Sequence, residues 1–171
     1  MTNNDLIMYG GIAVVAVVVI LYVFNWWKEK NSQKEKPESP GNSQTLSLRL
    51  QAYERLVLLT ERIALPSLIT RIPSGDFTVR QMQAVLVDQI KTEFDYNLSQ
   101  QIYVAPTAWQ AVNNLKEQNI YIVNQVASTL PADAKGGELS RRIVELLNAD
   151  PQASLHPIVF EALNFEAKKI M

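Results

Sequence analysis

The sequence predicts an all-α protein with an N-terminal transmembrane helix, a flexible tether and then a compact bundle of about five helices. Three observations lead to this prediction. Residues 6–27 form an apolar run without a charged side chain, as is typical of a membrane span. Residues 28–45 are polar throughout. From residue 46 onwards, apolar side chains recur at helical spacing, and alternation with period two is confined to the few residues around Ile102.

The apolar run is long enough to cross a bilayer, because as a helix it measures ~33 Å. Trp26 and Trp27 lie where an interfacial aromatic belt belongs, and Tyr9 lies near the other end. The alternative is a cleaved signal peptide. The length of the run and the absence of Lys or Arg from residues 1–5 disfavour that alternative, so we expect a retained anchor.

The charges around the run predict its orientation. Lys28, Lys30, Lys34 and Lys36 follow the run, whereas Asp5 is the single charged residue before it. The positive-inside rule therefore places the C-terminal side in the cytoplasm and leaves a short extracytoplasmic tip at the N-terminus. The first two lysines join the tryptophans as expected anchors at the membrane interface.

Residues 28–45 are predicted to be a polar, flexible linker. They include two prolines and a glycine, and the first apolar residue after them is Leu46. As a flexible coil this segment spans ~23 Å on average. The cytoplasmic helical domain, residues 46–171, is therefore expected to stay near the bilayer.

The helices of the domain are expected at residues 46–64, from 78 to about 98, from about 106 to 130, at 138–147 and from about 155 to the end. In the first helix, one apolar row contains Tyr53 and Val57, and we expect Pro66 to end the helix. Thr78 and Gln81 have the spacing of a capping box at the start of the second. Pro157 falls in the first turn of the last helix, where proline is tolerated. Short connections favour antiparallel neighbours.

Residue types that usually carry catalysis are scarce. The chain has no cysteine and one histidine, His156, which excludes disulfides, thiolate catalysis and Cys-ligated metal sites. None of the glycines forms a phosphate-binding loop. Asp88, Glu93 and Asp95 lack the Glu-x-x-His partners of a di-iron bundle. We predict no catalytic, cofactor or metal residues, and the net charge of -1 argues against a nucleic-acid partner.

Residues 93–104 are unusually rich in tyrosine and amide side chains. Such residues are typical of recognition surfaces. The alternative is that Asn97, Gln100 and Gln101 cap helix carbonyls and fix the turn that follows. Asn119 raises a similar question, because it lies on the apolar row of the third helix and is a candidate buried residue that fixes packing register.

Two segments carry a resemblance to a known family. The run LRLQAYERL at residues 48–56 with ERI at 61–63, and the segment from Glu93-Phe94 to NLSQQIYV at 97–104 with Trp109, resemble an uncharacterised Bacteroidota family of short, single-pass membrane-anchored helical proteins. The resemblance covers anchor, tether and domain. It implies the inner membrane of a Gram-negative-type cell, and it brings no activity, ligand or catalytic residue. It draws attention to a cluster on the first helix that is expected to pair with residues 97–101, namely Arg49, Gln51, Tyr53, Glu54 and Arg55.

Two function classes remain. The first is a membrane-anchored interaction or scaffold module, an accessory subunit of an inner-membrane assembly, whose partners are the lipid bilayer and either another protein or a second copy. The second is a membrane-tethered enzyme of unrecognised type. We prefer the first, because an enzyme needs convergent titratable groups in a cleft. The expected interaction surface comprises Arg49, Tyr53, Glu54, Tyr96, Asn97, Gln100, Gln101 and Tyr103.

Overall fold

The computed structural model describes residues 40–73, 75–150 and 153–171, and the regular structure in this part of the chain is helical. The elements are α2 (Pro40–Ile63), α3 (Leu65–Arg71), α4 (Val79–Tyr96), the 3-10 helix η1 (Leu98–Ile102), α5 (Pro106–Ser128), α6 (Gly136–Ala149) and α7 (His156–Ile170). Residues Gln44–Met171 form one compact unit. The prediction of an all-α helical bundle is therefore confirmed.

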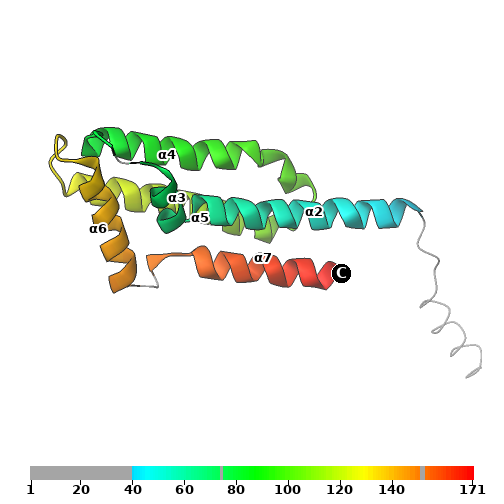
Figure 1. The fold of residues 1–171 in the computed structure, drawn as a ribbon. Coiled ribbons are helices and arrows are strands. Elements are labelled where there is room, and N and C mark those ends of the chain that lie inside the picture. The colour runs from blue at the N-terminus through cyan, green and yellow to red at the C-terminus, as the bar shows by residue number, and fades with distance from the viewer. Residues whose placement is uncertain (1–39, 74, 151–152) are drawn as a thin grey trace, which may run out of the picture. The chain divides into compact units, whose positions relative to one another are not determined.

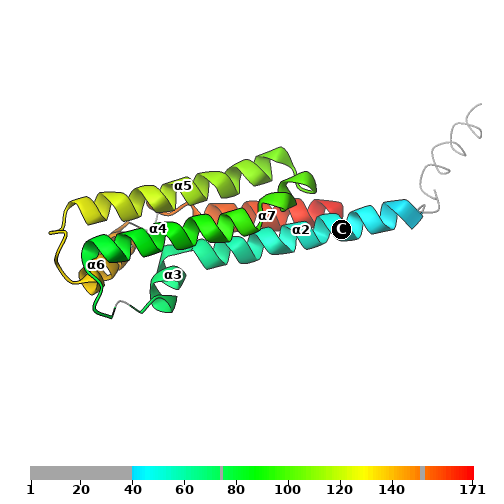
Figure 2. The same cartoon turned by 90° about the horizontal axis from the view of Figure 1, so that it is seen from above.

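Within this unit, α2, α4, α5 and α7 run alternately in opposite directions (Figures 1 and 2). Helix α4 packs against α5 and α6, and α5 packs against α7. On its far side α7 returns to α2, where the Nε2 atom of His156 lies 3.0 Å from Oε1 of Glu61. The short connections thus produce the antiparallel neighbours that the sequence predicts.

The core follows from the helical spacing of apolar residues. In α4, the buried side chains are Val79, Met82, Leu86, Ile90 and Phe94, spaced by three or four residues along one face. By helical spacing alone this row would continue to Leu98, but that side chain is 46% exposed. The row breaks because α4 ends at Tyr96 and the chain turns into η1.

The start of α4 is stabilised as the sequence predicts. The Gln81 amide N–H donates to Oγ1 of Thr78, and the Thr78 N–H donates to Oε1 of Gln81 at 2.9 Å, which completes a capping box. The N–H of Val79 donates to the carbonyl of Ala134 at 2.8 Å. The loop before α6 therefore satisfies a donor that the first turn of α4 leaves free.

The junction after α2 differs from the prediction. Helix α2 ends at Ile63, and Pro66 lies in the first turn of the separate helix α3. Proline suits the first turn because that turn needs no N–H donor, so Pro66 begins a helix instead of ending one. Asn119 is 1% exposed, and its amide donates to the carbonyl of Ile63 at 2.8 Å. The prediction of a buried polar residue at Asn119 is confirmed.

The predicted membrane span at residues 6–27 and its anchors Tyr9, Trp26, Trp27, Lys28 and Lys30 lie outside the described residues. Among the residues that are described, no helix combines the length and the hydropathy needed to cross a membrane. Residues 40–45, which the sequence assigns to the linker, belong to α2. Pro40 is the first residue of that helix, where the fixed φ of proline is compatible with the helical conformation.

Candidate functional site

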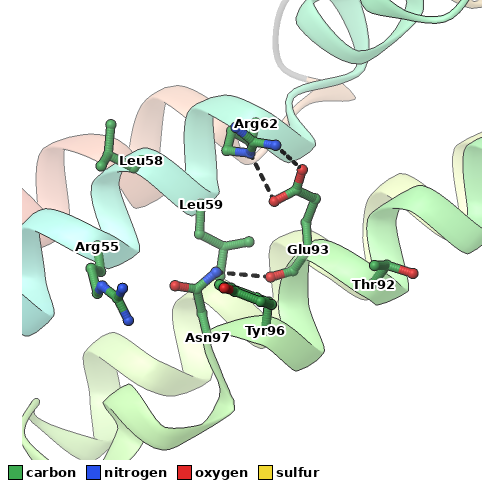
Figure 3. Close-up of a pocket in the computed structure, with 8 residues that line it drawn as sticks. All are labelled: Arg55, Leu58, Leu59, Arg62, Thr92, Glu93, Tyr96 and Asn97. Carbon is green, nitrogen blue, oxygen red and sulfur yellow. Dashed lines mark hydrogen bonds and ion pairs between the residues drawn. The ribbon is translucent and has the colours of Figure 1, made fainter.

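A groove of about 400 Å³ lies between α2 and the C-terminal half of α4 (Figure 3). It is termed the α2–α4 groove. Its walls come from two helices that are joined through α3 and the turn after it. The lining residues are Arg55, Leu58, Leu59 and Arg62 of α2, with Thr92, Glu93, Tyr96 and Asn97 at the end of α4.

Helical spacing places these side chains together. Arg55, Leu58 and Arg62 recur at intervals of three and four residues and therefore share one face of α2. On α4, Glu93 and Tyr96 are three residues apart and share a face in the same way. The antiparallel packing of the two helices then sets these faces against each other.

The groove exposes large apolar side chains to solvent. Leu58 is 56% exposed and Tyr96 is 80% exposed, and these two side chains come from different helices. Leu59, which is 1% exposed, belongs to the core beneath them. Large apolar side chains gathered at an exposed groove are typical of sites that bind another molecule.

An ion pair joins α2 to α4 along the groove. The Arg62 guanidinium donates to both carboxylate oxygens of Glu93, with 2.8 Å between Nε and Oε2. This hydrogen bond, together with the attraction between the two charges, raises the pKa of Arg62 above its ordinary value. Arg71 of α3 lies 3.9 Å from the same carboxylate and donates to the carbonyl of Arg62. The groove wall is therefore positioned by a bidentate pair, although an exposed pair adds at most about 1 kcal/mol of stability.

Arg55 differs from Arg62 in having no partner among the described residues. Its side chain is exposed in the groove wall, and the described part of the chain supplies it with neither a hydrogen bond nor an ion pair. An apolar groove with one unpaired guanidinium at its side can accept an apolar side chain and a carboxylate together.

The structure divides the predicted interaction surface into exposed and buried residues. Glu54, Tyr96, Gln101 and Tyr103 are exposed, and Arg49 is partly buried. Tyr53, Asn97 and Gln100 are buried, at 1%, 9% and 8% exposure. The expectation that Tyr53 and Gln100 lie on the surface is wrong, whereas Asn97 still lines the α2–α4 groove. The amides of Asn97 and Gln100 turn inward at the connection between α4 and α5.

Tyr53 and Asn97 hold the site together from within. The Tyr53 hydroxyl accepts the N–H of Ala105 at 3.1 Å, and Ala105 is the N-cap residue of α5, whose side chain provides no cap. Tyr53 thus ties α2 to the start of α5. The Asn97 amide donates to the carbonyl of Glu93 at 2.9 Å, which is the capping role that the sequence leaves open.

Beside the groove, the chain exposes a second group of apolar residues on and next to η1. Leu98 is 46%, Ile102 is 74% and Tyr103 is 38% exposed. They are termed the η1 corner. Asn97 separates Tyr96 from η1, so the groove and the η1 corner are neighbours along the chain.

Sequence reasoning did not place Leu58, Arg62 or Thr92 at the site. The sequence nevertheless indicates that Leu58 is unusual, because it lies off the apolar row of Tyr53 and Val57 and interrupts the polar face of α2 between Arg55 and Glu61. An apolar residue on an otherwise polar helix face marks a place that another group covers or binds.

Other titratable residues are dispersed. Across residues 40–73, 75–150 and 153–171, three or more His, Asp or Glu side chains nowhere gather into a group that would hold a metal ion. Asp88 and Asp95 are exposed, and Glu93 pairs with Arg62. His156 lies at the start of α7 beside Glu61, and its ring stacks with Phe160 at 6.1 Å between centroids. The arrangement fits a structural contact between α7 and α2.

The model of a family described as a family of unknown function (DUF7935) matches residues 3–170. Among curated proteins and among solved structures, no match is found.

Proposed function

We propose that this chain, which belongs to the DUF7935 family of unknown function, is a membrane-anchored interaction module whose α2–α4 groove binds a segment of another protein. The observation that carries this proposal is the groove itself, in which exposed Leu58 and Tyr96 lie beside the unpaired Arg55. Tyrosine and arginine are the residue types most enriched among those that dominate binding energy at protein interfaces.

The lining residues indicate the chemistry of the partner. An apolar side chain of the partner packs between Leu58 and Tyr96, and a carboxylate of the partner accepts hydrogen bonds from Arg55. The exposed residues of the η1 corner follow Tyr96 closely along the chain, and we expect the contact to extend onto them. A segment of a protein with acidic and apolar residues fits this surface better than a small molecule that the groove alone would hold.

The groove is held in position before binding. The ion pair between Arg62 and Glu93 links its two walls. Partly buried hydrogen bonds from Asn97 to Glu93 and from Ala105 to Tyr53 fix the end of α4 and the start of α5. A preformed site loses less conformational entropy on binding than a flexible one. This arrangement favours a binding role for the surface.

We further infer that the domain is attached to the inner membrane through one span at residues 6–27 and faces the cytoplasm. The support is the charge-free apolar run, the aromatic pair Trp26 and Trp27 at its end, and the lysines that follow. The resemblance to single-pass proteins of Bacteroidota supports the same placement. An anchored module of this kind is an accessory or scaffold subunit, which brings its protein partner to the bilayer.

The proposal is tested by comparing two exposed tyrosines. The full chain is isolated in mild detergent with its bound proteins, as wild type and as Tyr96→Ala, Arg55→Glu and Tyr121→Ala. Tyr121 is 62% exposed on α5 and serves as the matched control. The first two variants are expected to lower recovery of the bound protein about tenfold, because the loss of an interface anchor often costs about 1–2 kcal/mol of binding free energy. Tyr121→Ala is expected to recover as much of the bound protein as wild type. Equal recovery from all four forms would contradict the proposal.

A further inference from the structure

Helix α7 presents an apolar row on the side that faces away from the core. Val159 and Leu163 are buried against the bundle, whereas Ile158 is 66% and Phe165 is 61% exposed. With Ala162 between them, the two exposed residues follow the helical spacing of one face. In Figure 1 this helix lies at the edge of the bundle opposite α4. Apart from the Lys169 ammonium of the same helix, which lies 4.3 Å from the Phe165 ring centroid, the row has no partner among the described residues.

Two opposite charges lie beside this row. Glu161 and Lys168 are seven residues apart, which is two helical turns or about 10.5 Å along the axis. Both belong to the residues that line a shallow hollow on the outer side of α7. Neither has a partner among the described residues. Lys169, in contrast, is engaged, since its Nζ atom lies 2.7 Å from Glu166.

We propose that this face of α7 binds α7 of a second copy of the chain in antiparallel orientation. In a twofold arrangement, each contact between residue i and residue j is formed twice. An axis midway between residues 161 and 168 sets each Glu161 opposite Lys168 of the other copy, so both charges are satisfied at once. A parallel arrangement in the same register would place like charges opposite each other.

The same register also pairs the apolar residues. Met171 lies after the last residue of α7, so the apolar part of the contact comes from the exposed residues of the helix itself. Phe165 lies next to the axis, where it meets its own counterpart. The helix thus complements itself in charge and in apolar contacts. This interface is separate from the α2–α4 groove and does not depend on it.

The size of the face determines how the interface behaves. One helix pair buries less than the roughly 1,200–2,000 Å² of a standard stable interface. Association through α7 is therefore weak and depends on protein concentration. The two ion pairs mainly select the antiparallel register, since exposed charges at an interface contribute to specificity more than to affinity.

The absence of cysteine from the chain allows a direct test. Asn164→Cys places a thiol beside the proposed axis, and Asn148→Cys places one on the exposed side of α6 as the matched control. The full chain in its membranes is oxidised with a copper catalyst. We expect a disulfide-linked dimer from Asn164→Cys at a yield at least fivefold above that from Asn148→Cys. Equal yields from the two positions would overturn the proposal.

Charge reversal then tests the register. In the Asn164→Cys background, Glu161→Lys and Lys168→Glu each place like charges opposite each other and are expected to lower the dimer yield about fivefold. The double reversal restores opposite charges and is expected to restore the yield. Because neither residue has a partner among the described residues, thermal unfolding should be unchanged in all three. Failure of the double reversal to restore cross-linking would refute the antiparallel pairing.

Discussion

At the scale of single residues, a few polar atoms decide how the ends of the helices meet. The Tyr53 hydroxyl, the Asn97 amide and the Asn119 amide each satisfy a backbone group at a helix end or next to one. An unsatisfied buried backbone group costs about 1–3 kcal/mol. These three side chains are buried, and they support the α2–α4 groove and its surroundings from below.

Tyr53→Phe is expected to lower the stability of the chain by about 1–2 kcal/mol, because the ring stays in the core while the N–H of Ala105 loses its acceptor. The measurement is thermal unfolding of the full chain in detergent, followed by circular dichroism. Tyr121→Phe is the control, since that side chain is 62% exposed and its hydroxyl is available to water. Identical melting temperatures for the two variants would show that the hydroxyl of Tyr53 has no structural role.

The residue scale also shows which kind of sequence argument succeeds. Periodicity places Tyr53 in an apolar row of the first helix, and that is where it lies in the structure. Its residue type suggested an interface, which is wrong because a tyrosine ring packs equally well inside a core when its hydroxyl finds a partner. The burial of Asn119 is predicted by the same kind of argument, because this polar residue lies on an apolar row. Position on the helix was the better guide in both cases.

At the scale of elements, the loop before α6 and the start of α4 depend on one glycine. Gly136 is buried, and its N–H donates to the carbonyl of Phe77 at 2.6 Å. A Cβ atom at this position would lie 2.9 Å from that carbonyl oxygen and 3.0 Å from Cβ of Met82. The backbone of α6 approaches α4 so closely that a side chain has no space.

Gly136→Ala is therefore expected to destabilise the chain by about 1–3 kcal/mol through overpacking. Gly137→Ala is the matched control, because Gly137 is the next residue of α6 and is exposed. Alanine favours a helix over glycine by up to about 1 kcal/mol, so this control should be neutral or more stable. Thermal unfolding of both full-length variants measures the difference, and a stabilising effect of Gly136→Ala would contradict the close approach.

The sequence predicts the helices in which apolar residues recur at helical spacing over many residues, or in which residue types mark the first turn. The capping box at Thr78 and the early proline at Pro157 belong to the second kind, and both begin helices in the structure. The helices α3 and η1 were missed because each is too short to show a period. The sequence does not predict the groove as a shape, since the groove depends on how α2 and α4 pack. Of the two segments expected to pair, residues 49–55 and 97–101, Arg55 and Asn97 line it.

At the scale of the whole molecule, the proposed function assigns each part of the chain a separate task. Under the two proposals, residues 6–27 anchor the chain, the α2–α4 groove binds a protein segment, and the outer face of α7 binds a second copy. The groove and the α7 face involve different helix surfaces, so one can be altered without the other. Paired copies at a membrane would present two grooves, and two linked sites bind a multivalent partner more tightly than one.

The proposed orientation is open to a direct labelling measurement. Ser43→Cys introduces a single thiol into a chain without cysteine, on the side of the span that the lysines assign to the cytoplasm. A membrane-impermeant thiol reagent is expected to leave this position unlabelled in intact cells and to label it after lysis. Labelling of intact cells whose inner membrane is undamaged would reverse the orientation.

The most direct measurement of the central claim is photo-cross-linking from the groove in living cells. A photoreactive phenylalanine analogue replaces Tyr96 in the full chain, and the same analogue at Tyr121 is the control. We predict a discrete adduct with another protein from position 96 that Arg55→Glu abolishes, and no such adduct from position 121. An adduct that forms equally from both positions, or one from position 96 that is insensitive to Arg55→Glu, would contradict the account.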